Sequence, residues 1–246
     1  IDVGNLVGSS DKDIVVGRDS GSGNELYGYA HPGSDAFTSG TWSSIAFSSG
    51  ASASSVPITD VAIGDFDDDS DNDVAFVWGD NHQVRFESND GDDTFSFEGL
   101  QAFTEESFTI GVLKAYDVDG DDDDDVVGFD SGWQGGADEV AYLKSDGSWG
   151  WSVIDIASVD LFNIKDAVVA DFDSDGDGDM AIVGEWSAIH KETIHTIENN
   201  GDSDWDVDAQ SNYSPGATDK YTVTAVVVMD VDNDEWTDWD DLVVAV

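Results

Sequence analysis

The chain has 246 residues, in which 55 Asp and Glu face 8 Lys and Arg, so the formal net charge is -47. A surface this acidic repels phosphate backbones and anionic lipid headgroups, which argues against nucleic-acid binding and membrane docking and favours cations as partners. Hydrophobic residues make up 39% of the chain and aromatic residues 11%, far more than a disordered acidic tail carries. The chain should therefore fold.

Cysteine is absent, so we expect neither disulfides nor thiolate metal sites. No apolar run reaches the roughly 18 residues that a transmembrane helix needs, so we expect no membrane insertion. Residues 1–8 lack the charged and apolar regions of a signal peptide. Because the chain begins at Ile1 rather than at Met, we expect a processed or trimmed product.

The sequence repeats itself roughly every 55 residues, and the repeated feature is a cluster of Asp. An apolar, β-branched run leads into each cluster and a second apolar run leaves it, as in 163–172 and 180–184. Two further strands follow, such as 82–88 and 205–211, joined to their neighbours by turns rich in Asn, Asp, Ser and Gly. The first two strands should be buried and the outer two half exposed. Four strands per repeat are typical of propeller blades.

We therefore predict an all-β fold with a single domain, residues 1–246. The domain should be a β-propeller of four-stranded antiparallel blades, with about four full blades plus an additional strand pair. The units occupy residues 1–57, 58–108, 109–162, 163–220 and, for the partial unit, 221–246.

The partial unit ends at Val246 with an apolar strand. A closed ring needs its last blade completed. Another chain, strands shared between the termini, or further residues of a longer protein would each complete it, and the sequence leaves these three alternatives open. Because a bare strand edge recruits partners, a homo-oligomer or filament built through this pair is one expected assembly.

Carboxylates recur at positions one, three, five and nine of each full cluster, counted from its first Asp. Alternate residues of a tight loop direct their oxygens to one side, and calcium takes six to eight oxygen ligands, one of which the backbone carbonyl at position seven can supply. Magnesium fits less well, since it keeps its waters. The predicted ligands are Asp65, Asp67, Asp69, Asp71 and Asp73; Asp117, Asp119, Asp121, Asp123 and Asp125; and Asp171, Asp173, Asp175, Asp177 and Asp179.

An EF-hand is the obvious alternative for such loops. It needs a Glu at position twelve and a helix on each side. Position twelve is instead Phe76, Gly128 or Ile182, and each loop leads directly into an apolar run typical of a strand. The clusters therefore indicate calcium sites between strands.

The last cluster departs from this spacing. Its predicted ligands are Asp230, Asp232 and Asp234, with Asp238 at position nine and Asp241 directly before the strand as alternatives for the last ligand. A degenerate first copy has Asn5, Val7, Ser9 and Asp13 at positions one, three, five and nine, and Val7 offers no side-chain oxygen. We expect this copy to be empty, and three or four structural calcium ions in all.

The D-x-D-x-D-x-x-x-D loops, the apolar strand after each and the hairpin that follows resemble the FG-GAP and VCBS repeats of integrin α-subunit propellers and secreted microbial proteins. The resemblance covers nearly the whole chain and implies a propeller, structural calcium, and adhesion or ligand binding. The family's Gly at position six is present only as Gly176; Ser70, Asp122 and Glu235 replace it. Ser70 and Glu235 tolerate a left-handed backbone poorly, so we expect the second half of their loops to be shaped differently.

No catalytic motif is present, so we expect a binding protein rather than an enzyme, although the many acids leave a glycosidase-type carboxylate pair open. His190 and His195 are expected on the surface. Tryptophans at the starts of outer strands should pack between blades, with sugar stacking as the alternative, and Asn212 begins a glycosylation sequon. The equivalent tryptophans are Trp42, Trp149, Trp151 and Trp205.

Taken together, these features predict an extracellular or cell-surface calcium-binding propeller from a halophile, because a surface with so many acids and so few lysines stays hydrated in high salt. It would act as a binding, adhesion or self-assembling module whose partner is a protein or glycan on a cell surface or matrix. The alternative is an extracellular carbohydrate-binding lectin or carbohydrate-active enzyme built on the same blades.

Overall fold

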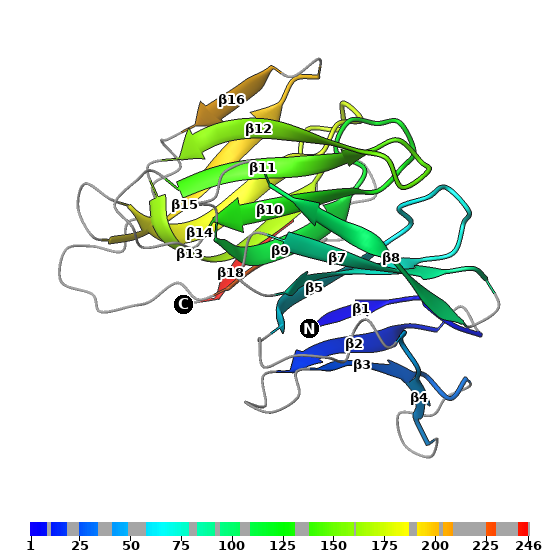
Figure 1. The fold of residues 1–246 in the computed structure, drawn as a ribbon. Coiled ribbons are helices and arrows are strands. Elements are labelled where there is room, and N and C mark those ends of the chain that lie inside the picture. The colour runs from blue at the N-terminus through cyan, green and yellow to red at the C-terminus, as the bar shows by residue number, and fades with distance from the viewer. Residues whose placement is uncertain are drawn as a thin grey trace.

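The computed structural model describes residues 1–8, 11–18, 25–33, 41–48, 58–78, 83–91, 94–103, 109–130, 138–159, 161–186, 191–201, 204–208, 225–229 and 241–245. The secondary structure of these residues is β strands and turns (Figure 1). No helix long and apolar enough to span a bilayer occurs among them.

Four antiparallel four-stranded sheets follow one another along the chain, which confirms the prediction of repeated four-stranded units. The first sheet contains β1 (Asp2–Gly4), β2 (Asp13–Arg18), β3 (Glu25–Ala30) and β4 (Ser43–Ile45). The second contains β5 (Ile58–Gly64), β6 (Asp73–Trp78), β7 (Gln83–Asn89) and β8 (Phe95–Ala102).

The third sheet contains β9 (Ile110–Tyr116), β10 (Asp125–Asp130), β11 (Asp138–Ser145) and β12 (Trp151–Val159). The fourth contains β13 (Leu161–Ala170), β14 (Asp179–Trp186), β15 (Lys191–Asn199) and β16 (Trp205–Asp208). The predicted final pair is also present, as the two-stranded sheet of β17 (Ala225–Met229) and β18 (Asp241–Ala245).

The second strand of a sheet is the most deeply buried. Every residue of β10 is buried, as are all but the last of β6, and both are nearly continuous apolar runs. The expectation that 82–88 is a half-exposed outer strand is wrong, because β7 is mostly buried. The reason is that neighbouring units cover both of its faces: Phe86 stacks on Trp151 of β12, and Glu87 accepts the backbone N–H of Ser48, which follows β4, at 2.8 Å. Solvent instead reaches β8, where Phe97 is 39% exposed and Leu100 46%.

The first strands of successive sheets lie beside one another, with β5 against β9, β9 against β13 and β13 against β17. Carboxylates on these strands tie neighbouring sheets together. Asp60 accepts the backbone N–H of Leu113 at 2.9 Å, and Asp166 accepts that of Val226 at 3.0 Å. These hydrogen bonds between first strands fix one sheet to the next.

The Asp-rich connections between first and second strands also contact the next sheet. The backbone carbonyl of Phe66 accepts a hydrogen bond from the Ser145 hydroxyl at 2.9 Å, and that of Val118 accepts one from the Asn199 side chain at 2.8 Å. Because Ser145 and Asn199 end the third strands of their sheets, the Asp65 and Asp117 loops are each held by the hairpin of the following sheet. The loops therefore follow one another along one edge of the molecule.

Candidate metal centres

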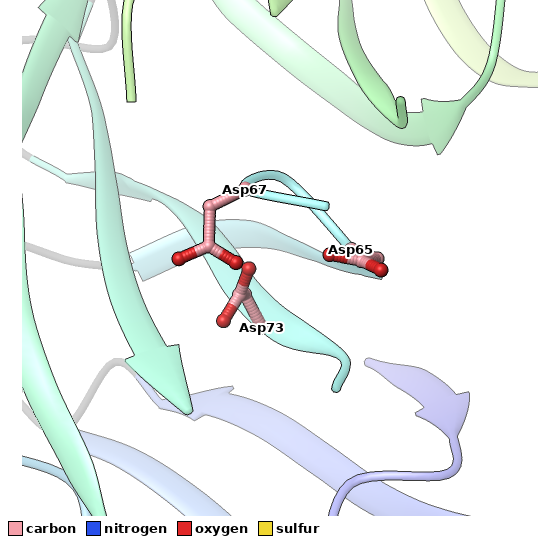
Figure 2. A group of neighbouring side chains, drawn as sticks. All are labelled: Asp65, Asp67 and Asp73. Atoms are coloured by element: carbon pink, nitrogen blue, oxygen red, sulfur yellow. The ribbon is translucent and has the colours of Figure 1, made fainter. Parts of the chain in front are cut away.

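Three of the predicted loops bring carboxylates together in the same way. In each, one oxygen from positions one, three and nine lies within 4.8 Å of the other two. Figure 2 shows the first group, in which Asp67 and Asp73 face each other and Asp65 approaches from the start of the loop. The groups are Asp65, Asp67 and Asp73; Asp117, Asp119 and Asp125; and Asp171, Asp173 and Asp179.

The first Asp of each loop closes the turn. Asp65 accepts the backbone N–H groups of Asp69 at 3.3 Å and Ser70 at 2.9 Å. Asp117 and Asp171 make the same two bonds, one to position five and one to position six. This short-range pattern depends only on the local sequence, so it repeats wherever the spacing repeats.

Positions four and six take the left-handed backbone conformation in all three loops. The φ angle of Ser70 is 73°, almost the same as the 74° of Asp122. The expectation that the Ser70 loop has a different second half is therefore wrong. The bonds that Asp65 accepts hold Ser70 in the strained conformation despite its Cβ.

Replacing Ser70 with Gly should raise the free energy of unfolding by about 1 kcal/mol, because Gly adopts a positive φ without steric cost. The measurement is urea unfolding in the presence of calcium. Ser152→Gly is the matched control, since Ser152 lies exposed in β12 and the same change there should lower stability. Equal effects at the two positions would contradict the assignment of strain to Ser70.

The position-nine carboxylates are buried and connect three parts of the fold. Asp73 accepts the backbone N–H of Phe66, in the loop, at 3.0 Å, and that of Asn89, at the end of β7, at 2.8 Å. Asp125 and Asp179 make the equivalent pairs of bonds. Burial raises the pKa of Asp73 to about 8, that of Asp125 to about 7 and that of Asp179 to about 6.

The metal-free chain should lose stability as the pH rises from about 4 towards 8. An Asp whose pKa is raised in the folded state binds more protons there than in the unfolded state, so the free energy of unfolding falls between its unfolded pKa of 3.8 and its folded value. Urea unfolding in chelator at fixed high salt measures this slope. With calcium present the slope should shrink or reverse, because the ion favours the charged carboxylate.

Asp13, in the degenerate first copy, shows that the carboxylate at position nine has a role apart from metal binding. It accepts the backbone N–H groups of Leu6 and Val7, each at 2.9 Å, and that of His31 at 2.7 Å. These are the bonds of Asp73 and its equivalents, made in the degenerate loop. That this loop binds no metal stays a prediction, and its Ser9 lies outside the described residues.

Position three supplies the clearest indication that these loops suit a cation. The Oδ1 atoms of Asp67 and Asp119 are buried and have no hydrogen-bond partner. Burial, and then the nearby Asp69, raise the pKa of Asp67. Since a buried, unpaired carboxylate oxygen is costly, these atoms fit a site in which a metal ion is the partner.

The carboxylates of positions five and seven lie outside the three groups. At position five, Asp69 accepts the backbone N–H of Asp71 at 2.9 Å, and the same bond recurs between Asp121 and Asp123 and between Asp175 and Asp177. A Cβ added to Gly91 would lie only 2.3 Å from the Asp71 carboxylate, so the hairpin glycine leaves room for it. Ligation by positions five and seven stays a prediction.

Most of the fourth predicted site lies outside the described residues. This applies to Asp230, Asp232, Asp234 and Asp238, and also to Glu235, Asn212 and His190. Asp241 begins β18, and only its backbone is described. The expectation of a surface position for His195 is wrong: it is 3% exposed, because it shares a face of β15 with Ile197, which packs in a buried apolar cluster.

In the Asp117 loop, the positive charge of a lysine side chain lies against the carboxylates. The ammonium of Lys144, in β11, contacts the carboxylates of Asp119 and Asp121, the latter at 3.0 Å. Ser88 and Glu198 occupy the equivalent place, one residue before the end of the third strand, in the second and fourth sheets. Lys144 therefore gives this one site a competitor for a bound metal ion.

Lys144→Ser, which copies Ser88, should raise the calcium affinity of the Asp117 site about tenfold, since the ion no longer displaces an ammonium from two carboxylates. Calorimetric titration measures this. Lys114→Ser is the control: Lys114 pairs with Asp166 at 3.6 Å, away from the loops, and its loss should leave all affinities unchanged. Weaker calcium binding after Lys144→Ser would show that the ammonium is part of the site.

Trp149 makes a contribution to the first site that the sequence did not indicate. Packing or sugar stacking was expected of it, and it does contact Phe86 at a ring separation of 5.8 Å. Its indole N–H also donates to the Asp67 carboxylate at 2.8 Å, from the neighbouring sheet. The two residues are far apart in the sequence, so no local pattern indicates this bond.

No known protein family and no curated protein matches the chain. Among solved structures, the fold is similar to that of a lectin from Agrocybe aegerita, described as recognising non-reducing terminal N-acetylglucosamine, at 17% sequence identity and a TM-score of 0.52. The match covers 80% of this chain and 52% of the lectin chain, so this chain spans about half the lectin's length. At this identity, the likeness shows a shared fold.

Proposed function

We propose that the chain is a calcium-stabilised β-propeller module of the FG-GAP and VCBS type that acts outside the cell in binding or adhesion. The four sheets are its blades, and β17 and β18 begin a fifth. The halophilic source rests on the net charge of -47, because so acidic a surface stays hydrated in high salt. The extracellular location rests on the resemblance of the loops to FG-GAP and VCBS repeats.

The observation that carries this proposal is the repetition of one oxygen cluster in three sheets, with a buried oxygen left unpaired in two of them. All the ligand atoms are carboxylate oxygens, which suit hard cations and not zinc or copper. Calcium is favoured over magnesium because it accepts six to eight oxygen ligands, which a loop of closely spaced carboxylates can supply, whereas magnesium usually keeps several waters.

When bound, calcium would supply the positive charge that these clusters lack. The chain's own residues shape the site in three ways. The Asp at position one closes the loop, the Asp at position three supplies the otherwise unpaired oxygen, and the Asp at position nine joins the loop to the hairpin. Because the Asp65 and Asp117 loops also bond to the next sheet, as Phe66 does to Ser145, an ordered loop there holds two sheets together. The ion's role is thus structural.

Counting the bound ions tests the proposal. Purified protein should bind at least three calcium ions by calorimetry and elemental analysis. Asp67→Asn, Asp119→Asn and Asp173→Asn should each remove one of them. Asp155→Asn, an exposed acid in β12, is the control and should remove none. A stoichiometry unchanged by the three variants would refute the sites.

Glycan binding is the second candidate, because the fold resembles that of a lectin. A glycan array probed in calcium and high salt tests it, with terminal N-acetylglucosamine as the first ligand. A polysaccharide depolymerisation assay on the same samples separates a lectin from an enzyme. Turnover of any polymer would exclude a purely adhesive role, whereas an array without signal would leave a protein ligand as the proposed partner.

A further inference from the structure

In the second, third and fourth sheets, the last residue of the third strand links the loop of its own sheet to the loop of the preceding sheet. In the third sheet this residue is Ser145. Its backbone N–H donates to the position-nine carboxylate of Asp125 at 2.8 Å, and its hydroxyl donates to the backbone carbonyl of Phe66 at 2.9 Å. Phe66, at position two of the preceding loop, donates its own N–H to Asp73 at 3.0 Å. Two position-nine carboxylates from different sites are thus joined by a path of three hydrogen bonds.

The path continues to the third site through the fourth sheet. Asn199, the last residue of β15, donates its backbone N–H to Asp179 at 2.8 Å and its side-chain amide to the Val118 carbonyl at 2.8 Å. Val118 is position two of the Asp117 loop and donates its N–H to Asp125 at 3.1 Å. The position-nine carboxylates of all three carboxylate groups therefore lie on one continuous hydrogen-bond path.

The same arrangement extends back to the degenerate loop. Asn89, the last residue of β7, donates its backbone N–H to Asp73 at 2.8 Å and its side-chain amide to the Leu6 carbonyl at 2.8 Å. Leu6 in turn donates its N–H to Asp13 at 2.9 Å. This interface has the hydrogen bonds of the other two, but we expect a calcium ion on only one side of it. It is therefore a reference for the effect of the bonds alone.

We call Asn89, Ser145 and Asn199 the relay residues. Their exposed fractions are 1%, 1% and 3%, so water cannot easily replace their hydrogen bonds. The N–H of the hairpin glycine two residues later holds each side chain from the other side. It donates to the Asn89 amide oxygen at 3.3 Å, to the Ser145 hydroxyl at 3.1 Å and to the Asn199 amide oxygen at 3.1 Å. Since backbone and side chain are both fixed, a relay residue cannot move without disturbing two loops.

Asp124 adds a direct link between the first two sites. Its N–H donates to the Asp65 carbonyl at 3.0 Å, and its carboxylate accepts the Asp65 N–H at 2.9 Å. Asp65 and Asp125, the next residue after Asp124, belong to different carboxylate groups. The first two sites are therefore joined both by the relay and by this pair of bonds.

Ordering of one loop prepares its neighbour for calcium. An ion at the Asp117 site holds the Asp125 carboxylate in place, and Ser145 then fixes the Phe66 carbonyl. Because Phe66 also bonds to Asp73, the first site is closer to its bound geometry before its own ion arrives. Less conformational entropy is then lost on binding, which raises the affinity, and linkage requires the effect to be reciprocal.

Repulsion between the ions acts in the opposite direction. Positions four to six of all three loops are exposed, so dissolved salt reaches the sites. The Debye length falls from about 10 Å at 0.1 M to about 3 Å at 1 M, so molar salt screens most of this repulsion. The relay bonds are buried and are screened much less. The favourable coupling should therefore dominate in molar salt.

We propose that neighbouring sites bind calcium cooperatively and that Ser145 and Asn199 are positioning residues that transmit this coupling. The coupling rests on the calcium-binding function proposed above and regulates it, because the sites then fill together within a narrow range of calcium concentration. One occupied site should raise the affinity of its neighbour about tenfold, of which a buried relay hydrogen bond supplies about fivefold.

A thermodynamic cycle of calcium titrations in molar sodium chloride measures the coupling. Asp173→Asn leaves only the first two sites, and adding Asp67→Asn or Asp119→Asn leaves only one of them. The product of the two stepwise binding constants of the two-site protein should exceed the product of the single-site constants about tenfold. The position-six amides of Ser70 and Asp122 report by NMR which site fills, since each donates to the position-one carboxylate of its own loop.

Ser145→Ala keeps the backbone N–H that Asp125 accepts and removes only the hydroxyl bond to Phe66. In this background the ratio should fall to about twofold, the part left to the bonds of Asp124, while the full chain still binds three ions. Ser145→Asn, which copies Asn199, should restore the tenfold ratio.

Asn89→Ala is the matched control. It removes the equivalent buried bond at the interface with the degenerate loop, so it should lower stability as Ser145→Ala does but leave the tenfold ratio unchanged. An equal loss of coupling in both variants would show a general loosening of the fold and overturn the proposal, as would a ratio of one in the two-site protein. Either result leaves the calcium count intact, whereas a chain that binds no calcium would refute both proposals.

Discussion

Asp73→Ala is expected to lower the free energy of unfolding by about 3 to 5 kcal/mol, because it leaves the backbone N–H groups of Phe66 and Asn89 buried without an acceptor. Asp73 is fully buried, so water cannot easily replace the carboxylate. The loss should appear in chelator as well as in calcium, and in calcium it should be larger, since one metal ligand is also removed. Urea unfolding under both conditions measures the two contributions.

Two further variants separate hydrogen bonding from metal binding. Asp13→Ala removes the same kind of buried acceptor in the degenerate loop, so it should cost a similar amount while the calcium count stays the same. Asp67→Asn should do the opposite: it should remove one ion and leave the metal-free chain as stable as before, or more so, because the charge on a partly buried carboxylate is lost. If Asp73→Ala destabilised only the calcium-loaded protein, the carboxylate would be a metal ligand without the structural role described here.

Chelation is expected to have the largest effect of all. An ion at one hundred times its dissociation constant stabilises the folded state by about 2.7 kcal/mol per site, so emptying three sites costs about 8 kcal/mol. For a chain of this size each kcal/mol lowers the melting temperature by about 2 to 4 °C, which predicts a fall on the order of 20 °C. Differential scanning calorimetry with and without chelator measures it.

Repulsion among the emptied loops adds to this loss. Burial raises the pKa of Asp123, and so do the neighbouring charges of Asp121 in its own loop and Asp68 in the adjacent one. High salt screens such repulsion, so sodium chloride should partly restore the metal-free melting temperature, and calcium should restore it fully at millimolar concentration. Recovery by magnesium equal to that by calcium would contradict the proposed selectivity, and a melting temperature unaffected by chelator would refute a structural ion.

The strand pattern was predictable because it depends on local features. Apolar runs such as those of β6 and β10 and the turn residues between strands repeat in the sequence, and four four-stranded sheets with a final pair result. The burial of β7 was not predictable in this way. A strand that alternates polar and apolar residues can have one face in water, and only the contacts that Trp151, in β12, and Ser48, after β4, make with β7 show that it does not.

The three carboxylate groups were likewise predictable only in part. The spacing in the sequence indicated every residue of the three groups, because positions one, three and nine of one loop are near one another along the chain. It did not distinguish position nine, which also holds the hairpin, from position three, whose oxygen is left unpaired. That difference arises from contacts with residues as distant as Asn89, which only the folded chain brings close.

The sequence by itself determined the class of fold, the number of sheets and the chemistry of the Asp loops, since periodicity, turn composition and ligand spacing are local properties. The tertiary structure decided which carboxylates are buried, which site contains the competing ammonium of Lys144 and which side chains join one loop to the next. These depend on how one sheet lies on the next, through side chains far apart in the chain. The net charge of -47 is likewise a property of the composition alone. Its effect on stability depends on which acids folding brings within a few ångströms of one another.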